Sequence, residues 1–539
     1  MKASMTLLVN RIRLSCDASV EEAFSVAKRR LRAIGVPTDA VQYSLYRRSV
    51  DARRKDDIHF VCTVAVRGHF PSLSDDLLKK HDIAMHKDAP MSVSYGHERL
   101  SAPPVVVGSG PCGLFCALLL AEHGYRPVVL ERGGDIRERR AAVARFNSHR
   151  ILDPTTNIQF GAGGAGTFSD GKLLTRIADP MISYVLDRFV SFGAPEDILY
   201  MAKPHIGTDI LSEVVERMLS RIEALGGRIC FHTQYLSHDA SSGRITSVLT
   251  NRGQIPCGAL ILAIGHSARD TYRTLMVEGV SMEAKSFSVG MRIEHLAEDI
   301  DRAMYGDMAG HPALGHAEYA LSYNTKERGV YTFCMCPGGT VVAAASEEGG
   351  VVVNGMSEHS RDGRNSNSAV LCSIFKEDYG STPEDAIAFQ YSIERAAYAA
   401  GGGSYAVPLT TVGDFLNDRQ GSAPTRILPT YMNGDAYTLT TPDSYLPKVV
   451  CRSIRAALLD FDRKIHGFAA EDALLSGAET RTSAPLRLLR HADTRLALGY
   501  SNLYPAGEGA GYAGGITSAS VDGLRTAQAL MARYAPLQG

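Results

Sequence analysis

The stretch PPVVVGSGPCGLFCALLLAEHGYRPVVLERGG, residues 103–134, constrains the fold more than any other part of the chain. Three valines, 105–107, predict a short buried strand, and the apolar segment that ends near Gly124 predicts a helix. A second buried strand, 127–130, ends at Glu131. This order of strand, glycine turn, helix and strand predicts a parallel sheet of the α/β class.

Three glycines in the turn, Gly108, Gly110 and Gly113, fit the spacing G-x-G-x-x-G. The first permits a tight turn, the second lets the backbone approach a pyrophosphate, and the third lets the helix pack against the strand. The N-terminus of the helix offers free N–H groups to phosphates, and Glu131 is placed to accept hydrogen bonds from ribose hydroxyls. The pattern predicts dinucleotide binding. The alternative is a strand-to-helix turn that merely tolerates glycine.

The last segment, LYPAGEGAGYAGGITSASVDG at 503–523, repeats the order of strand, glycine turn and helix. Its predicted strand ends at Gly507-Glu508, and the helix begins near Ile516. A second helix N-terminus late in the chain would close over the same cofactor and add an apolar wall for a flavin ring. An NAD dehydrogenase needs no such segment, so we expect FAD.

Several motifs together make the chain recognisable. They are 105–133, NIQFGAGGAGTFSDGKLLTR at 157–176, LAIGHSARDT at 262–271, FCMCPGG at 333–339, 354–369 and 503–523. With them the chain resembles, over about residues 100–535, a bacterial family of FAD-dependent dehydrogenases whose physiological role is mostly unassigned. The resemblance implies the two-domain fold of glutathione-reductase-like flavoproteins, with FAD between the first and last segments. Two positions depart from the family pattern: Ala162 replaces an acid, and Leu296 stands where proline is common.

The motifs and the resemblance together define the expected FAD contacts. These are Gly108, Gly110, Pro111, Cys112, Gly113, Glu131, Arg132, Gly164, Ala165, Gly166, Thr167, Lys172, Gly265, Gly507, Glu508, Gly515 and Ile516.

The loop 160–173 nearly matches the phosphate loop of a nucleoside triphosphatase, G-x-x-x-x-G-K-[ST]. Leu173 replaces the hydroxyl residue that binds magnesium, so we interpret the loop as a second clamp on the flavin. Backbone N–H groups of 163–167 would meet the polar edge of the flavin. Lys172 would lie near its N1–C2=O end, favouring the anionic reduced form.

We expect an α/β chain with a Rossmann-like FAD-binding domain of glutathione-reductase type, an inserted α+β substrate domain and a small N-terminal α/β domain. The expected divisions are 1–95 for the N-terminal domain, 101–275 and 486–539 for the two parts of the FAD-binding domain, and 276–485 for the insertion. Within the first, Ser19 with Glu22 predicts a capped helix that ends at Gly35. Strands are predicted at 41–52 and 58–68, and a helix at 72–84.

The candidate catalytic residues are Lys172, Cys336 and His295. In VYTFCMC, strand alternation places the sulfurs of Cys334 and Cys336 on one face. They are either thiols beside the substrate or buried strand cysteines; we favour the second, because the sequence shows no setting that would stabilise a thiolate. Two cysteines are too few for zinc, and no metal is expected.

Other polar residues leave their roles open. Arg292, Glu294 and His295 line a pocket or serve structure, and the same alternatives hold for His205. Arg481 stands where the chain re-enters the flavin domain, a usual location for pocket residues in this fold. Cys112 and Cys116, four residues apart in the first helix, are expected to pack on one helix face.

The net charge, the apolar segments and the cysteine content limit the kinds of partner and the cellular location that we expect. The net charge is −1 and the pI is about 7.0, which argues against nucleic acid. No signal peptide or apolar run of membrane-spanning length is expected, and ten scattered cysteines are typical of a cytoplasmic protein with reduced thiols. The partner of residues 1–95 is unknown.

The sequence therefore predicts an FAD-dependent oxidoreductase that transfers hydride between the flavin and an unidentified small organic substrate. The alternatives are a flavoprotein monooxygenase and an FAD-containing tRNA-modifying or interaction protein. No second G-x-G-x-x-G appears between 180 and 480, so NAD(P)H, if it is the reductant, would dock transiently.

Overall fold

A five-stranded parallel sheet organises the middle of the molecule. The computed structural model describes residues 5–71, 73–87, 91–324 and 327–537. The strand order is β23-β11-β5-β6-β7, with β5 at Val105–Val107, β6 at Val128–Leu130, β7 at Arg228–Cys230, β11 at Leu260–Leu262 and β23 at Leu503–Pro505. The closing segment thus returns to the sheet that the first segment began, as predicted, with β11 between β5 and β23.

Alternate residues of these short strands face two different cores. Val106, Val129 and Ile261 pack against helices α3 (Pro111–Glu122), α6 (Thr208–Ala224) and α13 (Ile516–Arg533). Val105 and Val107 face a three-stranded sheet of β8 (Tyr235–Ser241), β9 (Arg244–Thr250) and β10 (Gly253–Pro256). Because α3 is packed between α13, α6 and the sheet, ten of its twelve residues are buried. Its sequence is therefore apolar on all sides.

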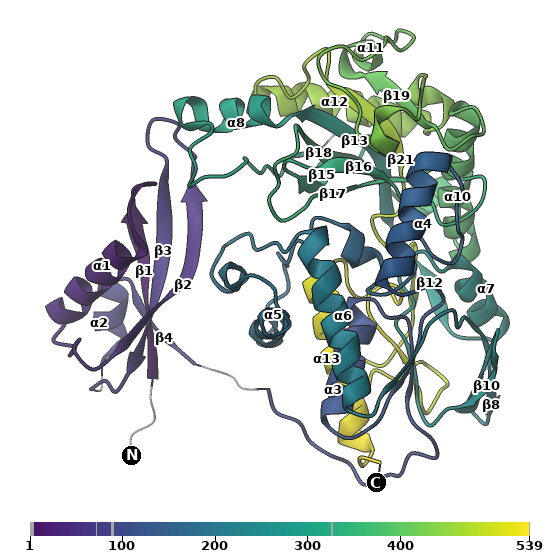
Figure 1. Ribbon diagram of the computed structural model, residues 1–539, viewed down its shortest axis with the longest axis horizontal. Coiled ribbons are helices and arrows are strands. Elements are labelled where there is room, and N and C mark those ends of the chain that lie inside the picture. The colour runs from purple at the N-terminus through teal and green to yellow at the C-terminus, as the bar shows by residue number, and fades with distance from the viewer. Residues whose placement is uncertain (1–4, 72, 88–90, 325–326, 538–539) are drawn as a thin grey trace.

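A second, seven-stranded sheet lies beside this unit (Figure 1). Its order is β14-β15-β18-β13-β21-β19-β20: β14 Ser322–Asn324, β15 Gly329–Cys336, β18 Asn365–Ile374, β13 Phe287–Leu296, β21 Leu474–Glu479, β19 Val407–Thr411 and β20 Tyr437–Leu439. Neighbouring strands are antiparallel except β19 and β20. The antiparallel pair β12 (Met282–Ala284) and β22 (Leu486–Leu488) stands where the chain leaves for this sheet and returns from it.

The remaining elements surround the two sheets. They are α4 Ile136–His149, α5 Met181–Ser191, α7 Arg269–Val277, α8 Ala297–Tyr305, α9 Lys376–Tyr379, α10 Pro383–Ala400, α11 Val412–Leu416, α12 Lys448–Lys464, and the hairpin β16 Thr340–Ala343 with β17 Val353–Met356. No helix in the described part of the chain combines the length and apolar character needed to cross a membrane.

The N-terminal residues form a separate sheet, at the left of Figure 1. Its order is β2-β3-β1-β4, with β1 Met5–Leu14, α1 Val20–Ala33, β2 Gln42–Asp51, β3 His59–Gly68, α2 Asp75–Lys80 and β4 Ile83–His86. This is the β-α-β-β-α-β arrangement of ferredoxin-like domains. A capping box of Ser19 and Glu22 begins α1, as predicted.

One expectation for this region is wrong. A single helix was expected over 72–84, but α2 ends at Lys80 and the next residues turn back as a strand. Asp82 has a left-handed backbone (φ 56°) that ends the helix, and Ile83 then pairs with Val9 of β1. The sheet contacts the rest of the chain through β2, where the backbone of Arg48 exchanges hydrogen bonds with Tyr200 and Ala202. The division of the chain at 95, 275 and 485 stays a prediction.

Candidate cofactor and active site

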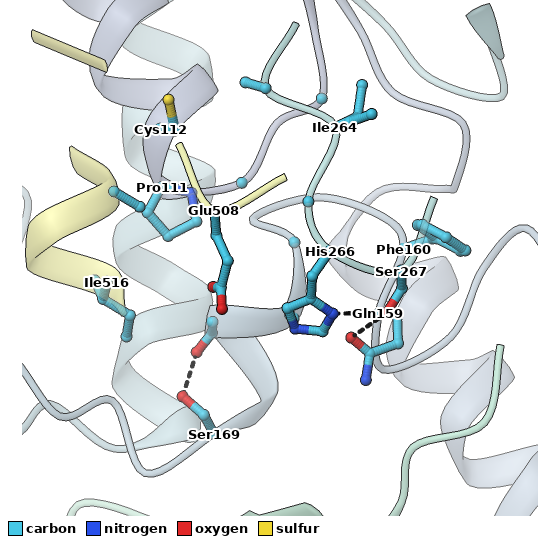
Figure 2. Close-up of a pocket in the computed structure, with 18 of the residues that line it drawn as sticks. Pro111, Cys112, Gln159, Phe160, Ser169, Ile264, His266, Ser267, Glu508 and Ile516 are labelled. Carbon is cyan, nitrogen blue, oxygen red and sulfur yellow. Dashed lines mark hydrogen bonds between the residues drawn. The ribbon is translucent and has the colours of Figure 1, made fainter. Parts of the chain in front are cut away.

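A cavity of about 350 Å³ lies where the parallel sheet meets the seven-stranded sheet. Figure 2 shows part of its lining, with Pro111 and Cys112 of α3, Ile516 of α13 and His266 around the space. The lining also includes Gly108, Gly110, Glu131, Arg132, Gln159, Phe160, Gly164–Gly166, Asp170, Lys172, Gly265, Phe333, Cys334, Asn354, Glu479, Arg481, Glu508 and Gly515. The cavity therefore extends from the first glycine turn to the strands β15 and β21 of the second sheet.

The first glycine turn has the geometry that its sequence predicts. Gly108 has a left-handed backbone (φ 100°), and a Cβ on Gly113 would stand 1.9 Å from the carbonyl oxygen of Gly108. Side chains are thus excluded at both positions by the protein itself. Gly110 differs: the nearest atom to an added Cβ would be the Cα of Gly164, at 3.8 Å. Gly110 borders the cavity, so its missing side chain leaves room for a ligand.

Two helices begin at this cavity. The first hydrogen bond within α3 runs from the N–H of Leu114 to the carbonyl of Gly110, which leaves the amides before Leu114 without helical partners. Helix α13 likewise begins at Ile516, after its N-cap Gly515. Two helix N-termini on one cavity favour a ligand with negative charge.

Glu131 ties the turn to the neighbouring loops. One carboxylate oxygen accepts from the N–H and the hydroxyl of Ser109, at 3.1 and 2.6 Å. The other accepts from the N–H groups of Gly133 and Gly161, each at 3.0 Å. These four donors occupy about as many acceptor sites as a carboxylate has. The predicted contact of Glu131 with a ribose stays a prediction, and it requires one of these donors to move.

A buried arginine organises the glycine-rich loop 157–166. Arg139 of α4 is fully buried and donates to the carbonyls of Asn157, Ile158 and Ala162 at 2.7, 2.5 and 2.7 Å. Burial lowers the pKa of Arg139 to about 9, and Glu131 opposes that shift. Ala162, the departure from the family pattern, packs its methyl group into the core beside α3 and does not line the cavity.

Part of the predicted clamp is already occupied. The N–H groups of Gly163, Gly164 and Thr167 donate to the Ser109 hydroxyl and to the carbonyls of Gly161 and Gly164, respectively. These three amides were predicted to face a ligand. In this conformation they are instead bonded within the protein. Ala165 and Gly166 line the cavity.

A carboxyl group points into the middle of the cavity. Glu508, in the turn between β23 and α13, projects between α3 and His266 (Figure 2). Burial raises its pKa to about 8, while Lys285 opposes the shift. The imidazole of His266 is neutral, because burial together with Arg481 and Arg269 lowers its pKa to about 3.

Charged residues gather at the end of the cavity formed by the second sheet. Lys172 lies 3.9 Å from a carboxylate oxygen of Asp170, which also pairs with Arg361. Arg361 in turn binds Glu318 at 2.6 Å. Both Lys172 and Asp170 line the cavity, so this end of it carries a cation and an anion side by side.

Cys334 lies beside this group, at an irregularity in β15. The strand pairing shifts between Phe333 and Cys336, and Cys334 has a left-handed backbone (φ 46°). The predicted regular alternation is therefore wrong at this point, because a bulge interrupts it. The bulge directs Cys334 into the cavity, while Cys336 is fully buried behind it.

A buried ion pair supports the bulge. Arg292 of β13 donates to the carbonyl of Cys334 at 3.1 and 3.3 Å, to Asn367 at 2.7 Å and to Glu479 at 2.8 Å. Burial raises the pKa of Glu479 to about 7, although Arg292 opposes that shift. Glu479 lines the cavity and is poised to hold or release a proton near neutral pH.

Most of the predicted cofactor contacts line this cavity. Those that do not are Gly113, Thr167 and Gly507, which shape the turns behind it. Among the catalytic candidates, Lys172 lines the cavity. Arg481, interpreted from its position as a pocket residue, also lines it. The other two candidates, Cys336 and His295, do not; His295 is buried and contacts the carbonyl of Phe468 at 2.8 Å.

Sequence reasoning missed several residues of the site. Asp170 and His266 stand within recognised motifs, and Glu479 stands two positions before Arg481, but none of the three carries a spacing signal of its own. Arg139 falls in a charged stretch that predicts an exposed helix, and only its burial distinguishes it from Arg140.

Comparisons with known protein families give separate matches for the part of the chain that carries the glycine turn and for the part that forms the seven-stranded sheet. Residues 102–257 match an FAD binding domain, and residues 286–482 match a family described as FAD-dependent protein, C-terminal domain-like. Residues 6–67 match a domain of unknown function. The first of these matches covers the first glycine-rich unit, and the second covers all the strands of the seven-stranded sheet.

Solved structures show only weak similarity. An L-amino acid deaminase from Proteus vulgaris is 13% identical, with 83% of this chain and 97% of that chain covered and a TM-score of 0.33. A glycine oxidase from Bacillus cereus is 11% identical, with 79% and 94% covered and a TM-score of 0.31. Similarity at this level specifies neither a substrate nor a reaction.

A relative in sequence is much closer. An uncharacterised protein of Clostridium beijerinckii is 43% identical over 535 residues, with 98% of this chain and 99% of that protein covered. The chain therefore belongs to the family of this clostridial protein, and it combines an FAD-binding domain with the C-terminal domain of FAD-dependent proteins.

Proposed function

We propose that the protein is an FAD-dependent oxidoreductase that transfers hydride, or an equivalent electron pair, between the flavin and a small organic substrate. The observation that carries the proposal is the single cavity shared by the glycine-rich FAD-binding unit and the polar residues of the second sheet. A cofactor held by the first unit would expose its reacting end to the second. Free thiols at all ten cysteines support a cytoplasmic location as part of this proposal.

The residues present fit FAD. The starts of α3 and α13 fit a diphosphate, because each presents unpaired N–H groups and a positive dipole end. The space that an added Cβ on Gly110 would fill fits a close approach of ligand to backbone. The Glu508 carboxyl, aimed into the cavity, fits the hydroxyl groups of a polyol chain.

Bound FAD would supply the two-electron chemistry, and the protein would supply binding, orientation and proton transfer. Gly110, Gly164–Gly166 and Gly515 would hold the cofactor, and Ile516 would add an apolar wall. Lys172 would favour negative charge on whatever group lies beside it. Glu479 is the group we propose as proton carrier, since its pKa is about 7 and its carboxyl borders the cavity.

The test separates cofactor binding from folding. Gly110→Ala adds a methyl group that the protein accommodates, 3.8 Å from its nearest protein atom, but that intrudes on the cofactor space. Gly113→Ala instead meets the Gly108 carbonyl at 1.9 Å and should destabilise the protein itself.

We expect the wild-type protein to bind FAD and show a flavin absorption spectrum. Gly110→Ala should weaken FAD binding at least about tenfold, a loss of about 1.4 kcal/mol, with the thermal unfolding of the cofactor-free protein unchanged. A colourless wild-type protein that does not take up FAD on reconstitution would refute the proposed function.

A further inference from the structure

We propose that Cys334 and Cys336 form a reversible dithiol–disulfide pair that exchanges two electrons with the flavin, as a second redox centre at the end of the cofactor cavity. This inference rests on the proposed function, because the electrons come from or go to bound FAD. Four features of the described structure carry it: the short separation of the two cysteines, the position of the Cys336 thiol, the cationic surroundings and the access from the cavity.

The backbone brings the two cysteines within bridging distance. Residues two positions apart are separated by at most about 7 Å between Cα atoms, even in an extended strand. The left-handed conformation of Cys334 (φ 46°) interrupts the regular strand at this point. A disulfide requires Cα atoms within about 7 Å of each other. The separation of the two cysteines by a single residue therefore meets this condition.

The thiol of Cys336 already folds back toward its neighbour. Its Sγ donates to the carbonyl oxygen of Cys334 at 3.4 Å. The interaction between the two thiols lowers the pKa of Cys334 below its ordinary value and raises the pKa of Cys336 well above it. One cysteine of the pair is thus favoured as a thiolate and the other as a thiol, the combination from which a disulfide forms.

The surroundings stabilise a sulfur anion. Arg292 contacts both cysteines: its guanidinium donates to the Cys334 carbonyl at 3.1 Å and lies 4.0 Å from the Cys336 sulfur. Arg292 and Lys172 both favour the thiolate of Cys334, against the opposing effects of burial and of Asp170. This is the setting that the sequence alone did not reveal, and it matches the electropositive surroundings of reactive cysteines.

Two glycines leave the room that this arrangement needs. A Cβ on Gly355 would stand 1.9 Å from the Arg292 guanidinium, and a Cβ on Gly339 would stand 3.0 Å from the Cβ of Cys336. A larger residue at position 355 would displace the arginine from the cysteines. The packing around the pair therefore depends on small residues from two separate segments, the strand β17 and the loop between β15 and β16.

The cavity gives the pair access to the cofactor. Cys334 lines the same cavity as Gly110, Gly166 and Ile516, whereas Cys336 lies behind it and is fully buried. Cys334 is thus the residue that faces the flavin, and Cys336 is the resolving cysteine, whose thiol closes the disulfide with Cys334. Among the described residues, the other cysteine that borders the cavity, Cys112, is held in a helix in an apolar core.

The step balances. Starting from the Cys334 thiolate and the Cys336 thiol, one S–S bond forms, one S–H bond breaks, and two electrons and one proton are released. The two electrons and the proton would pass to bound oxidised FAD. In the reverse direction, the disulfide would be opened by two electrons and a proton from reduced FAD, and a thiol or disulfide substrate could then exchange with Cys334.

The first experiment needs no cofactor. The full-length protein is equilibrated in a series of reduced and oxidised dithiothreitol mixtures, quenched in acid, denatured and alkylated, and the peptide that contains both cysteines is weighed by mass spectrometry. We expect a cooperative change from two alkyl groups to none along the series. Two alkyl groups at every mixture would overturn the proposal.

The second experiment counts electrons in the FAD-loaded, air-oxidised protein by anaerobic titration with dithionite. Wild type should take up about four electrons per chain, and Cys334→Ser and Cys336→Ser about two, because each disulfide is a two-electron couple. The matched control Cys372→Ser, a buried cysteine on the adjacent strand β18, should still take up about four.

The outcomes distinguish the two proposals. A protein that binds FAD but takes up only about two electrons refutes the dithiol centre and leaves the proposed function standing. A protein that binds no FAD refutes the proposed function, and with it the exchange of electrons between this pair and a flavin.

Discussion

Replacing Arg139 by methionine tests whether this buried arginine holds the loop 157–166 in shape for the cofactor. The guanidinium donates to three backbone carbonyls, at 2.5–2.7 Å, and contacts the ring of Phe168. Methionine has a similar length but offers no donor, so three buried carbonyls lose their partner. At about 1 kcal/mol for each net hydrogen bond, the loop loses about 3 kcal/mol of stabilisation.

That loss should appear in FAD binding, because the loop contributes Gln159, Phe160 and Gly164–Gly166 to the cavity. If FAD binding must restore the order of the loop, this loss of about 3 kcal/mol raises the dissociation constant of FAD about 100-fold. The constant is measured by titrating the cofactor-free protein with FAD and following the quenching of flavin fluorescence.

Arg140→Met is the matched control, since Arg140 occupies the next position of the same helix but is exposed. It should bind FAD as wild type does. Arg139→Lys keeps the positive charge but not the fork of donors, and we expect an intermediate affinity. Thermal unfolding checks that each variant is folded. The reasoning is refuted if folded Arg139→Met binds FAD within about threefold of wild type.

Two further predictions concern single side chains in the cavity. The Glu508 carboxyl stays protonated in the folded protein up to about pH 8, whereas its ordinary pKa is 4.5, so the unfolded chain loses that proton first. The unfolding temperature of the cofactor-free protein should therefore fall as the pH rises from about 4.5 to about 8; Glu508→Gln should weaken this dependence, and an identical pH profile in both proteins would contradict it. Lys172→Met should lower the reduction potential of bound FAD, measured by equilibration with a redox dye, if Lys172 lies near the flavin N1–C2=O end; an unchanged potential would count against that position.

Sequence patterns of short range were sufficient for the nucleotide-binding unit. The strand 105–107, the glycine turn and the helix that follows are encoded within about twenty residues. Each glycine of the turn has a steric role, and the spacing of the glycines is visible in the sequence itself. The Ser19–Glu22 capping box is equally local. The return of the chain at β23 and α13 was predictable because it repeats the same local pattern.

Long-range contacts decided the chemistry of the cavity. Arg292 and Glu479 are 187 positions apart, and no periodicity in either segment indicates that they pair. The pKa values of Glu479 and Glu508 depend on burial by elements distant in sequence. Arg139 and Arg140 are indistinguishable in a list of residues, and the packing of α4 against the glycine loop separates them.

The sequence by itself thus determined the class of fold, the cofactor-binding motif and where the chain returns to the first sheet. Tertiary structure alone decided which cysteine faces the cavity, because the bulge at Cys334 breaks the two-residue period on which strand alternation rests. It also decided that this thiol lies beside Arg292 and Lys172. Local patterns report the geometry of a regular element, whereas the reactivity of a side chain depends on charges and burial that folding brings from elsewhere in the chain.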